Sequence, residues 1–158
     1  MSTINGFLPH ANEGGGEIAT IHMPVATSQT IKAGYPVIIG TVAGKVYAGT
    51  SAAASILGVA AAAITTGTSP DETSCIPVWP AAPGNIFKGR ADSDLAVGLR
   101  LKLVDIVSTS GDLWKVDVGT ASTNVVFITD IPKVDTDAYN NDKMVYFKFA
   151  VSSYATPS

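Results

Sequence analysis

Apolar and polar residues alternate with a period of two along most of the chain after Glu17. In the segment Ala19–Val25, apolar residues at odd positions alternate with Thr20, His22 and Pro24. This period places successive side chains on opposite faces, so it predicts a β-strand with one buried and one solvated face. Pro24 lacks an N–H group, which places the strand at a sheet edge or a strand end.

The same pattern predicts further strands, separated by Gly-, Pro- and Asx-rich turns. They lie at Tyr35–Ile39, Thr41–Tyr47 (a hairpin around Ala43-Gly44), Ile56–Ile64, Cys75–Trp79, Ile86–Ala91, Leu99–Leu103, Trp114–Val118, Val125–Thr129 and Val145–Val151. One short helix is expected, capped by Asp92 or Ser93 and ending at Val97. About nine to eleven short strands with almost no helix predict a mainly β fold, a small β-sandwich or barrel-like domain.

The first sixteen residues lack this periodicity and end in three consecutive glycines. Glycine runs have high conformational entropy, so we expect residues 1–16 to form a flexible N-terminal arm and residues 17–158 a β-rich domain. The arm is either a frayed terminus or a segment that docks its apolar group on a neighbouring molecule. On the second interpretation the partner-contact candidates are Phe7, Leu8, Pro9, His10 and Ile18.

Charged residues make up only 15% of the chain, and the net charge is −3. A typical soluble domain has about 25% charged residues. Interface cores are poor in charge, so this composition favours assembly with other chains. The basic residues are scattered, which disfavours nucleic-acid and membrane-surface binding. No signal peptide is recognised, and the longest apolar run, around Ile56–Ile64, is too short to span a bilayer; we expect synthesis in a cytoplasm.

Candidate catalytic and ligand-binding groups are few. The two histidines, His10 and His22, are expected in the arm and on a solvated strand face, and Cys75 is the only cysteine. No hydrolase, zinc or phosphate-loop motif occurs, so the chain is expected to be non-enzymatic, without cofactor or metal. The Asx-rich segment Asp135–Asp142 could bind calcium, but its spacing does not fit an EF-hand and is typical of turns.

Several segments follow an order that is familiar from one family. They are Thr30–Val37 with its Ile-x-Ala-Gly turn, Ile56–Ala60 (Ile-Leu-Gly-Val-Ala), Ile76–Pro80, Gly84–Gly89, Leu113–Val118 and Val126–Asp130. In order and pattern they resemble the head decoration (capsid cement) proteins of tailed bacteriophages. The similarity extends over about residues 17–151, most of the chain, and consists of short strand and turn patterns.

The resemblance implies a β-tulip type domain that binds the outer capsid surface and links neighbouring capsomers. It also implies the major capsid protein as partner, self-association as a trimer or alternatively a dimer, and an extended terminal arm. It transfers no catalytic motif. Two other interpretations stay open: a phage tail or receptor-binding β module, and a carbohydrate-binding or hydrolytic β domain with Trp79 and Trp114 as sugar platforms.

Overall fold

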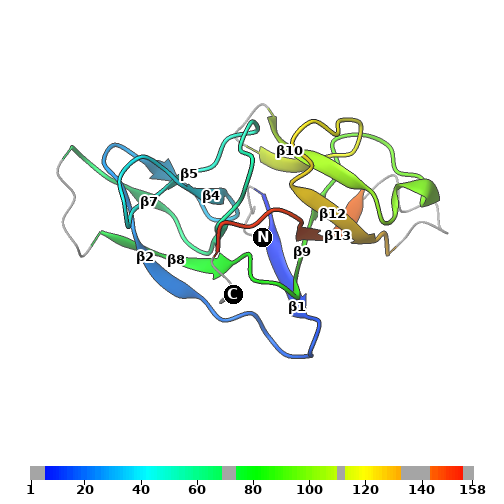
Figure 1. Cartoon of the computed structure of the whole chain (residues 1–158), viewed down its shortest axis with the longest axis horizontal. Helices are drawn as coiled ribbons and strands as arrows, with labels where there is room; N and C mark the ends of the chain where they lie inside the picture. The colour runs from blue at the N-terminus through cyan, green and yellow to red at the C-terminus, as the bar shows by residue number, and fades with distance from the viewer. Residues whose placement is uncertain (1–5, 69–73, 110–112, 133–142, 155–158) are drawn as a thin grey trace.

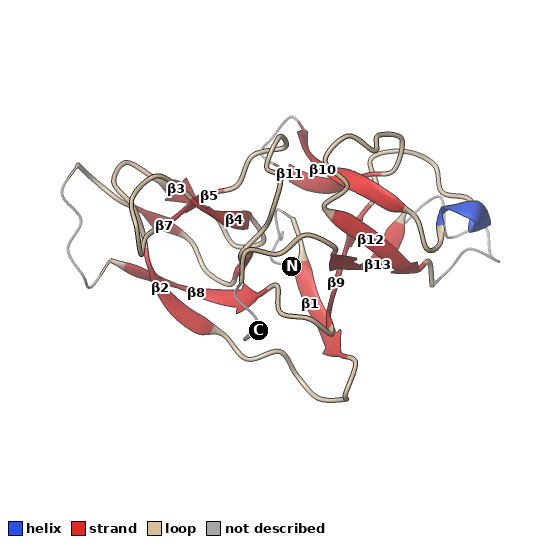
Figure 2. Cartoon of the chain, in the orientation of Figure 1, coloured by secondary structure: helices blue, strands red, loops and turns tan. Residues whose placement is uncertain are grey.

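The computed structural model describes residues 6–68, 74–109, 113–132 and 143–154. The chain is mainly β, with 48% of residues in strands and 2% in helix, and its sheets are antiparallel. Figure 2 shows the helical part of the described chain as a single short turn, η1 (Val97–Leu99). The mainly β class expected from the alternating pattern is therefore confirmed.

The strands form two lobes that lie side by side along the long axis of the molecule (Figure 1). Lobe 1 contains β2 (Ile21–Pro24), β3 (Thr30–Ile31), β4 (Pro36–Ile39), β5 (Val46–Ala48), β6 (Gly58–Ala60), β7 (Ile64–Thr65) and β8 (Cys75–Pro80). Lobe 2 contains β1 (Leu8–Asn12), β9 (Asn85–Arg90), β10 (Leu103–Thr109), β11 (Leu113–Asp117), β12 (Val126–Asp130) and β13 (Met144–Phe149).

Lobe 1 is a small five-stranded barrel. Its main sheet has the order β2-β8-β6-β4-β5, and every neighbouring pair is antiparallel. A parallel bridge between Val25 and Val46 then joins the two edge strands, and the Ala26 N–H donates to the Val46 carbonyl at 3.0 Å. Closing the sheet at this point satisfies backbone groups that an open edge would leave unpaired.

Lobe 2 repeats this arrangement. Its strands β9-β13-β12-β10-β11 follow in the equivalent order, again antiparallel. A parallel bridge between Ala91 and Val116 closes the sheet, and the Asp92 N–H donates to the Val116 carbonyl at 3.0 Å. In each lobe the first strand of this order, β2 or β9, is thus bridged just after its last residue to the last strand of the order, β5 or β11.

The two barrels also share their strand register. The Val25 N–H donates to Ser74 at 2.8 Å, and the equivalent Ala91 N–H donates to Lys143 at 2.8 Å. Following the registers outward from the bridges gives matched positions in the two lobes: Ile21 and Phe87, Met23 and Gly89, Ile38 and Asp105, Ile39 and Ile106, Gly58 and Val126, Val78 and Phe147. The chain is therefore a structural tandem repeat with one topology used twice.

The lobes are held together by contacts from three separated parts of the chain. The Phe7 N–H donates to the Gly34 carbonyl at 2.9 Å. The rings of Tyr35 and Trp114 meet edge to face across the junction, with centroids 6.2 Å apart. The Ile56 N–H donates to Val151 at 3.1 Å, so the last described segment also reaches lobe 1. The buried apolar residues consequently form one continuous core.

The prediction of a flexible N-terminal arm is wrong for residues 6–16. Strand β1 pairs antiparallel with β9, and Phe7 is fully buried. The glycines form a turn in which Gly15 and Gly16 have positive φ angles of 86° and 106°, and the Asn12 N–H donates to Gly16 at 3.2 Å. The apolar group Phe7–Pro9 thus stabilises its own chain, because burial in the core outweighs the entropy of the segment.

Two local expectations are corrected around β10. The expected helix beginning at Asp92 or Ser93 is replaced by the 3-10 turn η1, which lies farther along the chain. The expected strand Leu99–Leu103 begins only at Leu103, because Leu101 has a left-handed φ of 64° that a strand does not allow. Similarly, the expected strand Ile56–Ile64 divides into β6 and β7. The Asp135–Asp142 segment lies outside the described residues.

Candidate interaction surface

Phe7 was the leading candidate for contact with a partner, but the structure places its ring in an aromatic cluster of lobe 2. Its centroid lies 5.2 Å from that of Phe147 and 6.2 Å from that of Phe149, edge to face in both cases. The side chain is fully buried, so it contacts no partner surface. Burial in the core of its own chain therefore argues against the contact role predicted for Phe7.

The other predicted contact residues remain at or near the surface. Pro9, His10 and Ile18 are brought together around a hollow of about 270 Å3, which Glu17 and Trp79 complete. Leu8 is half-buried in β1 beside them. The His10 ring stacks on Tyr146 with centroids 4.0 Å apart and an interplanar angle of 12°.

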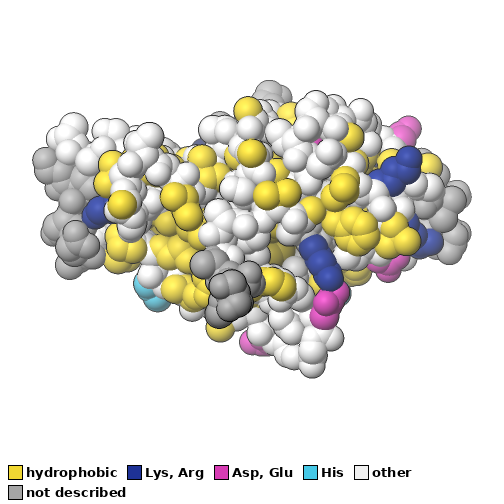
Figure 3. All heavy atoms as spheres, in the orientation of Figure 1, with side chains coloured by type: hydrophobic (Ala, Val, Ile, Leu, Met, Phe, Trp, Pro, Cys, Tyr) yellow, Lys and Arg dark blue, Asp and Glu magenta, His cyan; other side chains and the backbone are white. Residues whose placement is uncertain are grey.

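Charge is distributed very unevenly between the two halves of the sequence. The chain has 10 basic and 13 acidic residues. Residues 17–84, the part of the sequence that contains the strands of lobe 1, have only five of them: Glu17, Lys32, Lys45, Asp71 and Glu72. On the face seen in Figure 3, most charged side chains lie over lobe 2, whereas hydrophobic side chains are spread over both lobes. A molecule that covers lobe 1 therefore removes water from few charged side chains.

Lobe 1 also exposes large apolar side chains. Ile39 is 53% exposed, Val42 is 50% exposed and Ile21 is 38% exposed. At the matched positions of lobe 2, Ile106 and Phe87 are almost completely buried. The difference means that lobe 1 has an uncovered apolar region where lobe 2 has core.

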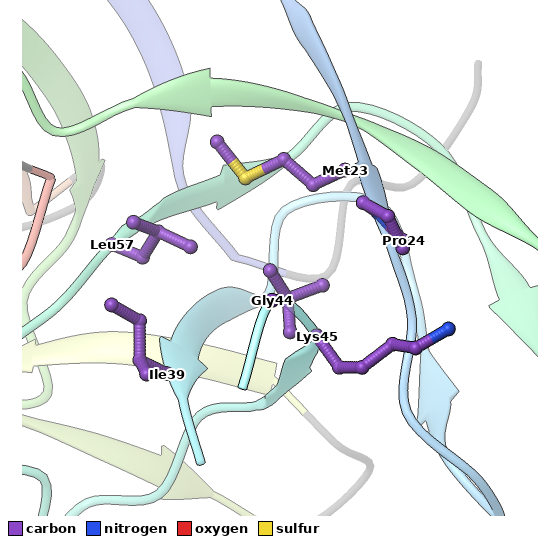
Figure 4. Close-up of a pocket in the computed structure, with 7 residues that line it drawn as sticks. Met23, Pro24, Ile39, Gly44, Lys45 and Leu57 are labelled. Carbon is purple, nitrogen blue, oxygen red and sulfur yellow. The ribbon is translucent and has the colours of Figure 1, made fainter. Parts of the chain in front are cut away.

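A groove of about 210 Å3 lies within this apolar region, between β2 and β5. Figure 4 shows the side chains of Met23, Ile39 and Leu57 pointing toward one another from three different segments of lobe 1. The remaining lining residues are Pro24, Gly44, Lys45 and Val46. An apolar, concave surface of this kind can accept one large hydrophobic side chain of a ligand. Sequence reasoning did not single out these residues, although the scarcity of charge in residues 17–84 could have indicated the lobe.

Among the described residues, the carboxyl group whose pKa is shifted is that of Asp105, and it serves the structure of lobe 2. Asp105 is buried, which opposes its ionisation, but the backbone N–H groups of Asn124, Ser122 and Thr123 donate to its carboxylate. These hydrogen bonds outweigh the desolvation and lower the pKa of Asp105. Asp105 thus fixes the loop before β12.

Within the described ranges, no group of three or more His, Cys, Asp or Glu side chains is placed to hold a metal ion. In the same part of the chain, no helix is long and apolar enough to cross a membrane. Comparison with protein-family models and with curated proteins finds no match. The candidate surface therefore has to be interpreted from its own geometry.

Proposed function

We propose that this chain is a non-enzymatic structural protein of a phage virion, which binds the outer surface of the capsid and links neighbouring capsomers. The observation that carries the proposal is the charge-poor lobe 1 with its exposed Ile39 and Val42. A surface with few ions and exposed apolar groups is suited to burial against a protein shell. The resemblance of the strand and turn patterns to head decoration proteins supports the same role.

The proposed mechanism is multivalent clamping by the folded tandem repeat. Each copy buries a modest apolar area against the major capsid protein, and many copies on a symmetric shell act together. Self-association as a trimer, or alternatively a dimer, raises the effective concentration of every further contact. Because β1 is part of lobe 2, we assign the shell contact to the surface of lobe 1 rather than to a free arm.

Co-sedimentation with shells assembled from the major capsid protein tests this proposal. The purified chain should pellet with the shells, and the substitution Val42→Asp should reduce its occupancy by about tenfold, because a carboxylate resists burial in an apolar contact. Leu101→Asp is the matched control, since Leu101 is 69% exposed but belongs to lobe 2. No co-sedimentation of the unmodified chain would refute the proposal.

A second candidate function, glycan binding, is favoured by the hollow beside β1. Trp79 is half-buried there, next to the polar side chains of His10 and Glu17. An aromatic face beside hydrogen-bonding groups suits a sugar ring. Trp114 is not such a platform, because it is buried against Tyr35. A glycan array separates the two functions: glycan binding that Trp79→Ala abolishes, without shell binding, would favour the second.

A further inference from the structure

The tandem repeat reveals what lobe 1 lacks relative to lobe 2. In lobe 2, β1 pairs with the outer edge of β9, from Leu8 opposite Lys88 to Asn12 opposite Asn85. In lobe 1 the matched strand is β2, whose one strand partner in the described chain is β8. Residues Ala19–His22, which match Asn85–Lys88, are exposed. Within the described ranges, one strand position of the repeat is therefore filled in lobe 2 and unfilled in lobe 1.

The side-chain space next to this edge differs in the same way. In lobe 2, Gly89 leaves room for the Phe7 ring, and a Cβ atom at Gly89 would lie 2.7 Å from the Phe7 Cδ1 atom. In lobe 1 the matched residue is Met23, which lines the apolar groove between β2 and β5. A methionine side chain is unbranched and adaptable, so it can move aside for an incoming apolar group.

The backbone of β2 is oriented to accept another strand. The Val25 N–H points to β8, where it donates to Ser74, and the Ala26 N–H points the other way, to Val46. Since the direction alternates along a strand, the backbone groups of Thr20 and His22 face the outer edge. Pro24 stands at an outward position too, where the missing N–H costs no bond to β8.

We propose that the outer edge of β2 and the adjoining groove form a docking site for an extended segment of another protein. The segment adds to lobe 1 as an antiparallel strand, in the way that β1 adds to lobe 2, and inserts one large apolar side chain beside Met23, Ile39 and Leu57. Main-chain hydrogen bonds supply affinity in this mode of recognition, and the inserted side chain supplies specificity.

The internal equivalence identifies the occupant. The strand that fills the matched position of lobe 2 begins with Phe7 and continues as Leu8–Asn12. This segment is committed to its own lobe, because Phe7 is fully buried there. The occupant of lobe 1 is consequently a segment of a different protein with the same chemistry: a strand that begins with an aromatic or large aliphatic residue and is otherwise uncharged.

A synthetic peptide with the sequence of Gly6–Asn12 is the probe for this site. Added at millimolar concentration to the full chain, it should slow backbone hydrogen exchange in residues 19–23 by about tenfold or more, while β9 is unchanged. The same peptide with Ser in place of Phe7 should protect at least about tenfold less, because burial of the apolar side chain is lost.

Protein variants separate docking from folding. Ile39→Asp should abolish protection, whereas Leu101→Asp, in lobe 2, should not change it. His22→Pro removes an outward N–H and should weaken peptide binding about tenfold without unfolding the chain, whereas Ile21→Pro removes an N–H directed at β8 and should destabilise the sheet.

Two outcomes would overturn the site. One is unchanged exchange of residues 19–23 at millimolar peptide. The other is protection of these residues by self-association at high protein concentration, which would make a second copy the occupant. The peptide experiment involves no capsid, so its failure is distinguishable from a failure to bind shells.

Discussion

Lobe 1 and lobe 2 share strand order, register and closing bridges, yet they complete their cores differently. In lobe 2, the Phe7 ring fills the space beside Gly89 of β9, and β1 pairs with the outer edge of β9. Lobe 1 has Met23 at the matched position, an exposed Ile39 and an uncovered β2. The same frame thus gives one barrel whose edge is covered by its own chain and one whose β2 edge we propose as a docking site.

The difference in charge follows the difference in closure. Lobe 2 carries most of the charged side chains, as expected of a surface that stays in water. Lobe 1 carries five, two of which lie outside the described residues. If lobe 1 binds a partner as we propose, substitutions at matched positions should affect stability in lobe 2 and binding in lobe 1.

The largest effect should come from removing the side chain that closes lobe 2. Phe7→Ala leaves a cavity in the cluster with Phe147 and Phe149, and we expect it to lower the free energy of unfolding by about 4 kcal/mol. Met23→Ala, at the matched place in lobe 1, should cost about 1 kcal/mol because its side chain is only partly buried. Urea denaturation measures both. Equal small losses would contradict the closure of lobe 2 by Phe7.

The next prediction concerns whether a glycine is needed at position 89 to leave space for the Phe7 ring. Gly89→Ala places a Cβ atom 2.7 Å from the ring and should destabilise the chain by about 2 kcal/mol. Adding Phe7→Leu should recover part of this loss, because a smaller side chain relieves the overlap. Gly98→Ala is the control, since a Cβ atom there meets nothing within 4 Å. Thermal unfolding of the unmodified chain, the single variants Gly89→Ala and Phe7→Leu, and the double variant gives the coupling.

A comparable effect concerns Asp105, which has the uncharged Ile38 as its counterpart in lobe 1. The lowered pKa of Asp105 means that its ionised form stabilises the folded chain above the unfolded-state pKa of about 4. This stabilisation is lost as the pH falls through the folded-state pKa. Asp105→Asn should cost about 2 kcal/mol at pH 7 and flatten the decline of stability below pH 4.

The control for this prediction is Asp117→Asn, on the neighbouring strand directly opposite Asp105. Its carboxylate does not hold the loop before β12, so the acid-dependent decline should persist. Urea midpoints measured from pH 3 to pH 7 provide the comparison. An Asp105→Asn profile that still declines like that of the unmodified chain would refute the assignment.

The sequence predicted strands well wherever alternation was strong, as in β8, β11 and β13. The prediction failed where the local sequence pattern favours one structure and contacts with distant residues favour another. Leu99–Leu103 alternates like a strand, but the left-handed Leu101 ends the turn before β10. Phe7–Pro9 was interpreted as an arm because its partners, Gly89 and Phe147, are distant in sequence.

The tandem repeat was also hidden from the sequence. Its clearest trace is the pattern Val-x-Ala/Val-Gly-Thr, which occurs at Val46–Thr50 and again at Val116–Thr120. Strand register is set by backbone pairing. The side chains at matched positions, such as Gly58 and Val126, can therefore differ in chemistry. The groove of lobe 1 is visible only from the comparison of the two lobes and from the exposed fractions of its side chains. The alternation of apolar and polar residues along the sequence contains neither kind of information.

The smallest expected effect is the most informative about lobe 1. Ile39 and the matched Ile106 lie on equivalent faces of their barrels, but Ile39 is 53% exposed and Ile106 is 1% exposed. Ile39→Asp should therefore change the free energy of unfolding by less than about 0.5 kcal/mol, as at an ordinary surface position. Urea denaturation at neutral pH measures this change. A loss above about 2 kcal/mol would mean that the groove is closed in the free chain, since only a buried site penalises a carboxylate so strongly. A negligible loss, together with a loss of peptide binding, would assign Ile39 to recognition rather than to folding.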